Sequence, residues 1–347
     1  MRHHSTLFQY RCRQCGKAGF FERLPEGVAC HHCGFAHRVS STGVIDFAPK
    51  STEQDAYFDG IYSAGRMHKI DELNEQPVRT YENSREPARS YLSLCGYDLA
   101  RPVENLSILD LACGSGWVTA GLLQHASIRN CKFHAFDISP DGPELLAGFV
   151  SSHPGANEVE LSVQDATAMV FEDASFDVIV GSSVLHHFDD VERFLRDCKR
   201  ILRPGGVATF GEPFALGYGL GAAALVVAQR QTGRAYQGLT ECYNDIAFRI
   251  KSPASALAPL VDKHLFFQSS FLNLAKKIGF KEIAFIPLAP RTFYRNDFIH
   301  ELMLERGIAD AELERAANSI YRVFFDLFDA ETYGQSVAAF IQVVMRA

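Results

Sequence analysis

The stretch LDLACGSGW, residues 109–117, joins a short apolar run to two closely spaced glycines, and this combination decides the fold. Gly114 and Gly116 permit a close backbone approach, and a following helix would present free amides and a positive dipole end to a negative group. A dinucleotide fingerprint carries glycine or alanine at its third position, where this chain has Thr119. A pyrophosphate is therefore less well accommodated at this turn.

Short apolar runs alternate with helical patterns from Asn105 onward. We expect strands at 107–112, at KFHAFDIS ending at Asp137, at VELSVQDA ending at Asp165, at FDVIVGSSV (176–184) and at VATFGE (207–212). Between the last two, VERFLRDCKRIL has apolar residues spaced as on one helix face. This alternation predicts a parallel, doubly wound α/β sheet, with its ligand beyond the carboxyl ends of the strands.

Acidic residues stand at the ends of the first three expected strands: Asp110, Asp137 and Asp165. A carboxylate after the second strand suits two ribose hydroxyls, and one after the third suits an adenine amine. The combination favours an adenosine without a diphosphate. Structural alternatives remain open, because Asp137 and Asp165 could cap helices and Asp110 could bond the amides of the glycine loop.

Five ordered motifs over residues 105–212 resemble the class I S-adenosylmethionine-dependent methyltransferases, of the type 11 kind: LDLACGSG, FDIS, QDATAM, FDVIVGSSVLHHFDD and ILRPGGVATFGEP. The segment SFLNLAKKIGFKEIAFIPL (270–288) looks like that family's last helix and sixth strand, and VAAFIQVVMRA looks like its seventh strand. The resemblance implies a Rossmann-like, doubly wound, seven-stranded and mostly parallel sheet. It also implies S-adenosyl-L-methionine as the cofactor.

The resemblance further implies a set of cofactor-binding residues along these motifs. The expected residues are Asp110, Ala112, Gly114, Ser115, Gly116, Asp137, Ile138, Asp165, Ala166, Ser182 and Ser183. The glycine loop would line the methionine part, Asp137 would hold the ribose, and Asp165 with Ala166 would flank the adenine. The two serines would lie near the reacting sulfur.

Candidate catalytic residues follow the fourth and fifth strands. His187 and His186 lie in VLHHF, where the family places substrate-facing residues, and an imidazole that titrates near neutrality can accept a proton from an acceptor. Glu212 is a second candidate for general base. A packing role for the histidines competes with this interpretation, because LHHF is widespread in the family among members with different acceptors.

Two segments exceed the minimum of the family, at 213–270 and 290–333. They contain many aromatic residues: Phe214, Tyr218, Phe266, Phe267, Phe293, Tyr294, Phe324, Phe325 and Phe328. We expect these helical insertions to form a lid over an apolar or aromatic small molecule, or else the interface of a homodimer. Aromatic residues at helical spacing are also typical of an ordinary core.

The first 48 residues contain two CxxC pairs, Cys12 with Cys15 and Cys30 with Cys33. Four thiolates complete a closed tetrahedral zinc shell, which leaves no open position for catalytic water. We therefore expect a structural zinc ribbon at 1–48, a helical lead-in at 49–104 and the methyltransferase domain at 105–347 with its two insertions. The remaining cysteines, expected to be small buried hydrophobes, are Cys95, Cys113, Cys131, Cys198 and Cys242.

The distribution of charge along the chain bears on the choice between two classes of methyl acceptor. Residues 1–50 contain seven Lys/Arg and three Asp/Glu, a net +4, so the remainder carries −11 to give the total of −7. An acidic body disfavours a polyanion, so a small, largely apolar or aromatic metabolite is the favoured acceptor. A base of ribosomal or transfer RNA remains the alternative acceptor, with the zinc ribbon recognising the RNA, because a cysteine ribbon ahead of this fold also resembles the ribosomal-RNA guanine methyltransferases. Here SSVLHH replaces the NPPY-type signature, which disfavours base amino groups and leaves ring nitrogens open.

The longest apolar run, at 220–228, is far shorter than the roughly 20 residues that span a bilayer. The polar start MRHHST lacks the apolar core of a signal peptide. We therefore expect a cytoplasmic protein with no membrane span.

Replacing one expected zinc ligand tests the structural role of the ribbon. Cys12→Ser should lose bound zinc and lower the free energy of unfolding, because a ribbon of this size does not fold without its metal. The affinity of the folded fraction for S-adenosyl-L-methionine should change little. Metal analysis, thermal unfolding and cofactor titration measure these effects, and a large loss of cofactor affinity in the folded fraction would contradict a purely structural site.

Overall fold

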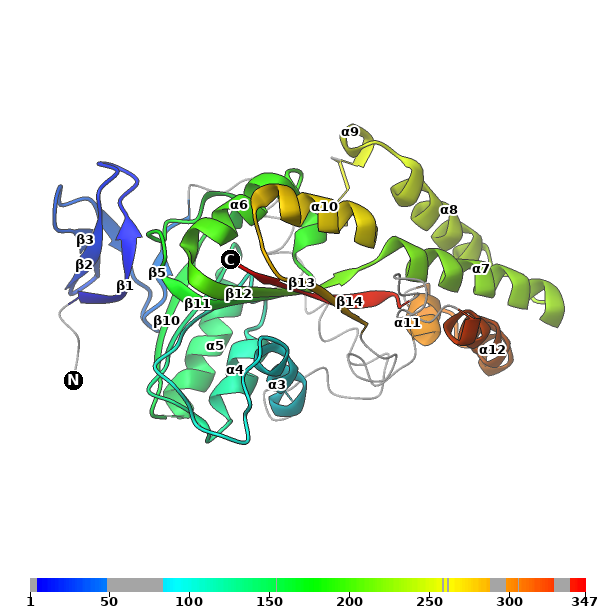
Figure 1. Cartoon of the computed structure of the whole chain (residues 1–347), viewed down its shortest axis with the longest axis horizontal. Coiled ribbons are helices and arrows are strands. Elements are labelled where there is room, and N and C mark those ends of the chain that lie inside the picture. Colours follow the sequence, from blue (N-terminus) through cyan, green and yellow to red (C-terminus); the bar gives the residue numbers. More distant parts are fainter. Residues whose placement is uncertain are drawn as a thin grey trace.

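The computed structural model describes residues 5–48, 84–153, 155–257, 259–260, 262–287, 298–304, 306–327 and 338–347 (Figure 1). Most of the expected helical lead-in, at 49–83, lies outside these residues, and so do 288–297 and 328–337 of the second insertion. Three of the expected lid aromatics, Phe293, Tyr294 and Phe328, fall in these two gaps.

The main sheet has eight strands in the order β13-β14-β12-β11-β7-β9-β10-β5. Their bounds are β5 Ile45–Asp46, β7 Ser107–Leu111, β9 Lys132–Asp137, β10 Glu158–Val163, β11 Phe176–Ser182, β12 Leu202–Pro213, β13 Ile283–Pro287 and β14 Phe340–Arg346. All neighbours pair in parallel except β14, which is antiparallel to both β12 and β13. The expected doubly wound, mostly parallel sheet is confirmed, and β5 adds one strand to the expected seven.

Helices cover both faces of this sheet (Figure 1). One face carries α3 Arg85–Leu94, α4 Trp117–Leu123 and α5 Asp141–Ser152, and the other carries α6 Val191–Ile201 and α10 Gln268–Ile278. Two 3-10 turns, η2 Ala166–Ala168 and η3 Leu185–His187, follow β10 and β11, and β6 Val103–Glu104 pairs with β8 Ile128–Arg129. This arrangement places the loops after β7, β9, β10 and β11 at one edge of the sheet.

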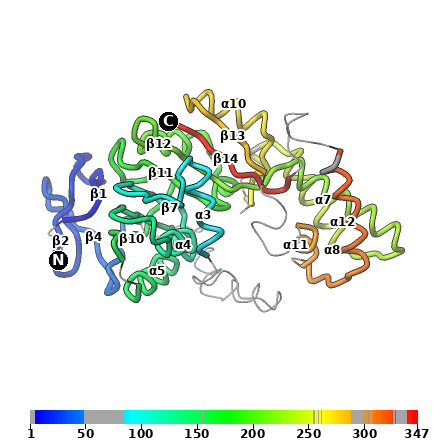
Figure 2. The backbone as a smooth tube through the Cα atoms, turned by 60° about the horizontal axis from the view of Figure 1, so that its bottom comes forward, coloured from blue at the N-terminus to red at the C-terminus, as the bar shows by residue number. Residues whose placement is uncertain are grey.

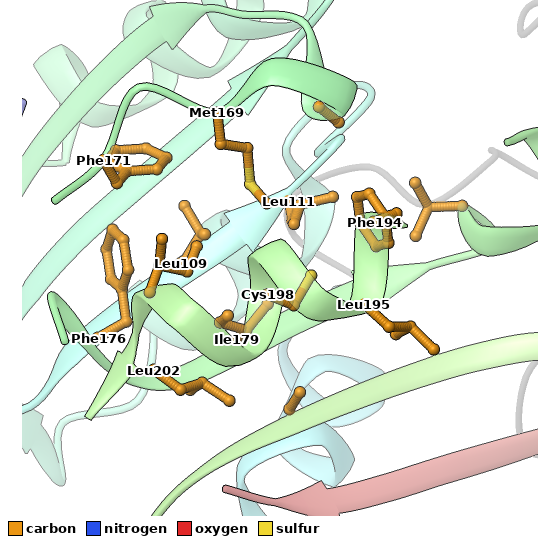
Figure 3. Packing of buried hydrophobic residues seen from close by; sticks show 14 of the residues in the cluster. Leu109, Leu111, Met169, Phe171, Phe176, Ile179, Phe194, Leu195, Cys198 and Leu202 are labelled. Carbon is orange, nitrogen blue, oxygen red and sulfur yellow. The ribbon is translucent and has the colours of Figure 1, made fainter. Parts of the chain in front are cut away.

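Helix α6 is capped at its start and buries the face that its apolar spacing predicted. The side chain of Asp190 accepts a hydrogen bond from the amide of Arg193 and so caps the first turn. Five residues of the helix are buried, at the positions that the apolar spacing predicted: Val191, Phe194, Leu195, Cys198 and Ile201. Figure 3 shows Phe194, Leu195 and Cys198 in the same cluster as Leu109 and Ile179 of the sheet.

The two insertions form a helical unit with its own core, made of α7 Ala215–Thr232, α8 Gln237–Lys251, α9 Ala254–Leu257, α11 Phe298–Leu304 and α12 Ala311–Leu327. Helix α7 continues directly from β12, so the unit projects beyond the carboxyl end of that strand (Figure 1). Most described aromatics of the insertions pack inside this unit or, like Phe214, against the sheet. Phe267 is an exception, since it is 44% exposed.

The N-terminal ribbon is a four-stranded antiparallel sheet of β1 Ser5–Arg11, β2 Ala18–Leu24, β3 Gly27–Cys30 and β4 Ala36–Arg38. Strand β5 follows the ribbon and pairs in parallel with β10 of the main sheet, while Ile45 also forms an isolated antiparallel bridge with Val39. The ribbon therefore connects to the edge of the large sheet and lies at the opposite end of the molecule from α7 and α12 (Figures 1 and 2).

A buried carboxylate joins the ribbon to β10. Glu160 accepts hydrogen bonds from Tyr10 Oη at 2.5 Å, from Arg23 Nη2 at 2.7 Å and from the amide of Leu7 at 2.9 Å. Burial raises the pKa of Glu160, and the bonds from these donors oppose that rise. On burial the carboxylate loses its bound water, and hydrogen-bond donors that all come from the ribbon replace that water.

An apolar interface surrounds this carboxylate. Tyr10 is fully buried and packs against Phe47 and Phe171, with ring centroids 4.6 and 5.6 Å apart. The ribbon side chains belong to the same hydrophobic cluster as the α6 face of the sheet. The ribbon and the sheet therefore share one core.

None of the described helices is both long enough and apolar enough to cross a membrane.

Removing the charge of Glu160 should loosen this interface. Glu160→Gln replaces one acceptor oxygen by an amide donor and leaves buried donors of the ribbon without partners, which should cost about 3 kcal/mol of unfolding free energy. Urea unfolding measures the loss. The matched control is Glu22→Gln, an exposed glutamate on β2, and equal stabilities of the two variants would show that the Glu160 contacts do not hold the ribbon.

Candidate functional site

Two neighbouring strands at the centre of the sheet bring the expected site together. Strand β11 pairs in parallel with β7, with Val180 opposite Asp110. The chain crosses from β7 toward β9 on one side and later returns to β11 on the other, so the strand order reverses between β7 and β11. In open α/β sheets, ligands bind outside the carboxyl ends of the strands at such a switch point.

The loop after β7 has left-handed backbone at three positions. The φ angles are +50° at Ala112, +53° at Gly114 and +78° at Gly116. Glycine adopts such angles without steric cost, but the Cβ of Ala112 makes this conformation unfavourable there. The loop ends at Gly116, and α4 begins at Trp117 with its amino end facing the loop.

Asp137 ties the glycine loop to the end of β9. Its Oδ2 accepts a hydrogen bond from the amide of Gly114 at 2.8 Å, and its Oδ1 accepts one from the amide of Ser139 at 3.1 Å. The carboxylate is nearly buried, at 5% exposure. It therefore fixes the loop, while ribose binding by Asp137 stays a prediction.

A further glycine, which the sequence analysis did not single out, is needed beside the loop. A Cβ on Gly142 would lie 1.9 Å from the carbonyl oxygen of Gly114, so only glycine permits the first turn of α5 to approach the loop this closely. The dipeptide Gly-Pro also occurs at ordinary helix starts. The local sequence DGPELL therefore did not predict that Gly142 would lie so close to the glycine loop.

Asp110 has a structural role. Its Oδ2 accepts hydrogen bonds from the amide of Thr119 at 3.0 Å and from its hydroxyl at 2.7 Å. Burial raises the pKa of Asp110 to about 6, although the two bonds from Thr119 favour the ionised form. Asp110 therefore anchors the first turn of α4, which is a different contact from the expected bond to the loop amides.

Asp165 lies two residues beyond the end of β10 and caps η2. Its Oδ1 accepts hydrogen bonds from the amide and the hydroxyl of Thr167, at 2.8 and 2.7 Å. This is the helix-capping alternative that the sequence left open, and Ala166 beside it is buried. Arg13 of the ribbon donates a hydrogen bond to the carbonyl of Ala168 in the same turn.

The remaining expected cofactor residues lie along the same edge. Ile138 follows β9 and is partly buried, Ser182 ends β11, and Ser183 has a φ of +57° and donates its amide proton to the carbonyl of Gly211. Ser115 lies between the two loop glycines. The structure therefore brings all eleven expected positions to the carboxyl ends of β7, β9, β10 and β11; cofactor contact by each remains a prediction.

Glu212 organises the loop after β11. Its Oε1 accepts hydrogen bonds from the amides of Val184 and Leu185, at 2.9 and 2.8 Å, and its Oε2 lies 2.8 Å from His186 Nδ1. The side chain is fully buried. These contacts give Glu212 a positioning role, because it holds η3 and orients the ring of His186.

His186 and His187 meet a carboxylate that the sequence analysis missed. Asp262 Oδ1 lies 3.6 Å from His186 Nε2 and 3.3 Å from His187 Nδ1. Burial disfavours the charged form of His186, but hydrogen bonds to Asp262 and Glu212 outweigh it and raise the pKa to about 9. Of the two histidines, His187 has the more exposed side chain, at 21% against 10% for His186.

The four ribbon cysteines are placed as the ligands of one ion. Cys12 Sγ lies 3.7 Å from Cys33 Sγ, and Cys15 Sγ lies 3.8 Å from Cys30 Sγ. Sulfur atoms about 2.3 Å from a tetrahedral zinc are about 3.8 Å apart, so this donor set fits zinc. The five other cysteines are buried, as expected.

Comparison with known proteins assigns this architecture to a class. Residues 109–210 match the family model of a methyltransferase domain. The matched segment runs from β7 through most of β12 and contains the glycine loop and the two histidines. This part of the chain is a class I, S-adenosylmethionine-dependent methyltransferase domain of type 11.

Curated relatives share this segment. The ubiquinone biosynthesis O-methyltransferase of Rhizobium etli is 31% identical over 110 residues, which are 31% of this chain and 41% of that protein. The protein of the same description from Rhizobium leguminosarum bv. trifolii is 32% identical over 110 residues, 31% of this chain and 40% of that protein. This chain thus spans about two fifths of the length of these relatives.

A solved structure shares the fold. Phosphoethanolamine N-methyltransferase 2 of Haemonchus contortus, in complex with phosphomonomethylethanolamine and S-adenosylhomocysteine, has a TM-score of 0.51 and 17% identity. The match covers 86% of this chain and 60% of that one.

The pKa of Asp110 predicts a pH dependence of stability. A carboxyl whose pKa rises from 3.8 to about 6 on folding stabilises the fold below pH 3.8, and this contribution is lost as the pH rises through about 6. Asp110→Asn keeps an oxygen for both donors of Thr119 and does not ionise. Its unfolding free energy relative to wild type should therefore be about 2 kcal/mol more favourable near pH 7.5 than near pH 4.

Urea unfolding across this pH range measures the difference. The control is Asp98→Asn, in the exposed turn after α3. A difference between Asp110→Asn and wild type that stays constant with pH would show that Asp110 has no raised pKa in the folded protein.

Proposed function

We propose that the protein transfers the methyl group of S-adenosyl-L-methionine to a small, largely apolar or aromatic metabolite. The observation that carries this proposal is the arrangement at the β7–β11 switch point. There the glycine loop and Asp137 lie beside the histidine pair that follows β11. Methyl transfer from a sulfonium is an in-line displacement, so the protein mainly aligns the acceptor and excludes water.

The residues on either side of the switch have different parts in this proposal. Gly114, Ser115 and Gly116 line the methionine portion of the cofactor, Asp137 binds the ribose, and Asp165 with Ala166 flanks the adenine. Ser182 and Ser183 lie near the reacting sulfur. His187 faces the acceptor, while Glu212 and His186 hold the loop that carries it.

The helical unit supports a small acceptor. It extends beyond the carboxyl end of β12, and its segment 262–266 returns to the site, where Phe266 bonds to the backbone of Pro213 and Ala215. The named relatives are O-methyltransferases of ubiquinone biosynthesis, which supports an oxygen on an apolar or aromatic molecule as the acceptor atom. The ribbon, which would recruit RNA in the alternative, lies at the other end of the molecule (Figure 2). We also propose a cytoplasmic location for this activity.

One labelling experiment distinguishes the acceptors. Purified protein is incubated with methyl-labelled S-adenosyl-L-methionine and fractionated cell extract, and the label is followed into RNA and into small molecules. Label in an organic-soluble small molecule is expected. Label confined to RNA would overturn the proposed acceptor class, and no protein-dependent transfer in any fraction would contradict the activity.

Cofactor binding has its own test at Asp137. Asp137→Ala removes the expected ribose acceptor together with the bond to Gly114, so the affinity for S-adenosyl-L-methionine should fall at least tenfold, about 1.4 kcal/mol. Isothermal titration calorimetry measures the affinity, with Asp98→Asn as the control. An unchanged affinity in Asp137→Ala would place the cofactor elsewhere.

A further inference from the structure

Three side chains at the carboxyl end of β11 form a second group of metal-ligating atoms, apart from the ribbon. One ligand atom each of His186, His187 and Asp262 lies within 4.8 Å of the other two. We propose that these three residues bind a divalent transition metal, with zinc as the reference ion. Binding of the metal does not depend on the proposed methyl transfer.

The separations of the ligand atoms match a tetrahedral site. Asp262 Oδ1 is 3.6 Å from His186 Nε2 and 3.3 Å from His187 Nδ1. Nitrogen and oxygen ligands about 2.0–2.2 Å from a tetrahedral zinc are about 3.3–3.6 Å apart. Both measured separations therefore suit an ion placed between the three side chains, and small side-chain adjustments suffice to bind it.

Glu212 supplies the outer contact that metal-bound histidines usually have. Its carboxylate lies 2.8 Å from His186 Nδ1, which directs Nε2 toward Asp262. Such a carboxylate fixes the tautomer and the ring orientation, and it increases the basicity of the ligating nitrogen. Because Glu212 is itself held by the amides of Val184 and Leu185, the ring has a rigid support.

The backbone holds Asp262 beside the histidines although it comes from a distant insertion. The carbonyl oxygen of His186 accepts hydrogen bonds from the amides of Lys263 and His264, at 2.8 and 3.2 Å. The ring of His264 lies 2.9 Å from the carbonyl of Phe188. The segment that carries Asp262 is thereby attached to η3 on both sides of His187.

Asp262 is also available to an ion. The ammonium of its neighbour Lys263 bonds to the carbonyl of Leu260 and lies 3.8 Å from Asp189. In the part of the chain that the structure describes, the ion pairs of Asp262 within 4 Å are those to His186 and His187. Two histidines that share one carboxylate are a donor set suited to zinc and to neighbouring transition metals.

Three protein ligands leave a fourth position open, as in catalytic rather than structural zinc sites. The histidines follow β11 and the glycine loop follows β7, and these two strands are paired in parallel, so both loops lie at the same edge of the sheet. If the proposed methyl transfer holds, the ion would bind a hydroxyl oxygen of the acceptor at this position and lower its pKa, so that the proton would pass to water. The oxygen then forms the bond to the methyl carbon, and the carbon–sulfur bond breaks with its electron pair passing to sulfur.

Zinc titration tests the site in the full chain with its ribbon already loaded with zinc. Isothermal titration calorimetry should show one further zinc per wild-type chain, and binding at least a hundredfold weaker in Asp262→Asn and in His187→Ala. The matched control is Asp189→Asn, an exposed carboxylate of the same region, which should retain the further zinc. No further zinc in wild type, or unchanged binding in Asp262→Asn, would overturn the proposal.

Cobalt distinguishes this site from the ribbon. Cobalt added to protein with a zinc-loaded ribbon should give visible absorption without thiolate-to-metal charge transfer, and Asp262→Asn should lose this absorption. A spectrum with thiolate charge transfer would place the added ion at the cysteines and contradict the proposal.

Cofactor titration in the same variants separates this proposal from the proposed function. Asp262→Asn should bind S-adenosyl-L-methionine as wild type does, because Asp262 is not among the residues expected to bind the cofactor. A wild-type chain that takes up the further zinc without binding the cofactor would refute the methyl transfer and leave the metal site standing. A chain that binds the cofactor but no further zinc would refute the metal site alone.

Discussion

Parallel pairing between β7 and β11 is the constraint on which the site depends. Parallel strands end at the same edge of a sheet, so the loops that follow them are neighbours whatever their separation in the sequence. In this chain one loop contains the glycines and the other the histidines. Their proximity therefore follows from backbone hydrogen bonds at the centre of the sheet, where the strands are buried on both faces.

Local patterns explain why much of this could be predicted. The strands β7, β9 and β11 are short and mostly apolar, and α6 has a single apolar face, so the fold class could be predicted from periodicity and from the glycine loop. The cysteine spacing likewise predicted the group of four thiolates that the structure brings together. These features depend on residues close in the sequence.

Other features depend on contacts between distant segments. Asp262 lies in the insertion, 75 residues after His187, and VDKH has no motif that marks it as a partner of the histidines. Glu212 was a candidate general base because it is a carboxylate at a strand end. Its role in positioning η3 depends on hydrogen bonds from the amides of Val184 and Leu185, which are distant in the sequence. Strand β5 is two residues long, and its parallel pairing with β10 has no local signature in the sequence.

The position of the ribbon on β10 has a consequence for how the chain avoids self-association. Without β5 and the ribbon, β10 would be the outermost strand of the large sheet, and exposed edges are templates for pairing between molecules. The ribbon covers that edge only while it is folded, and its four clustered cysteines are placed to hold a zinc ion that would stabilise it. An ion bound there would thus protect the sheet against edge-to-edge aggregation, and the metal supply of the cell would then govern the solubility of the protein.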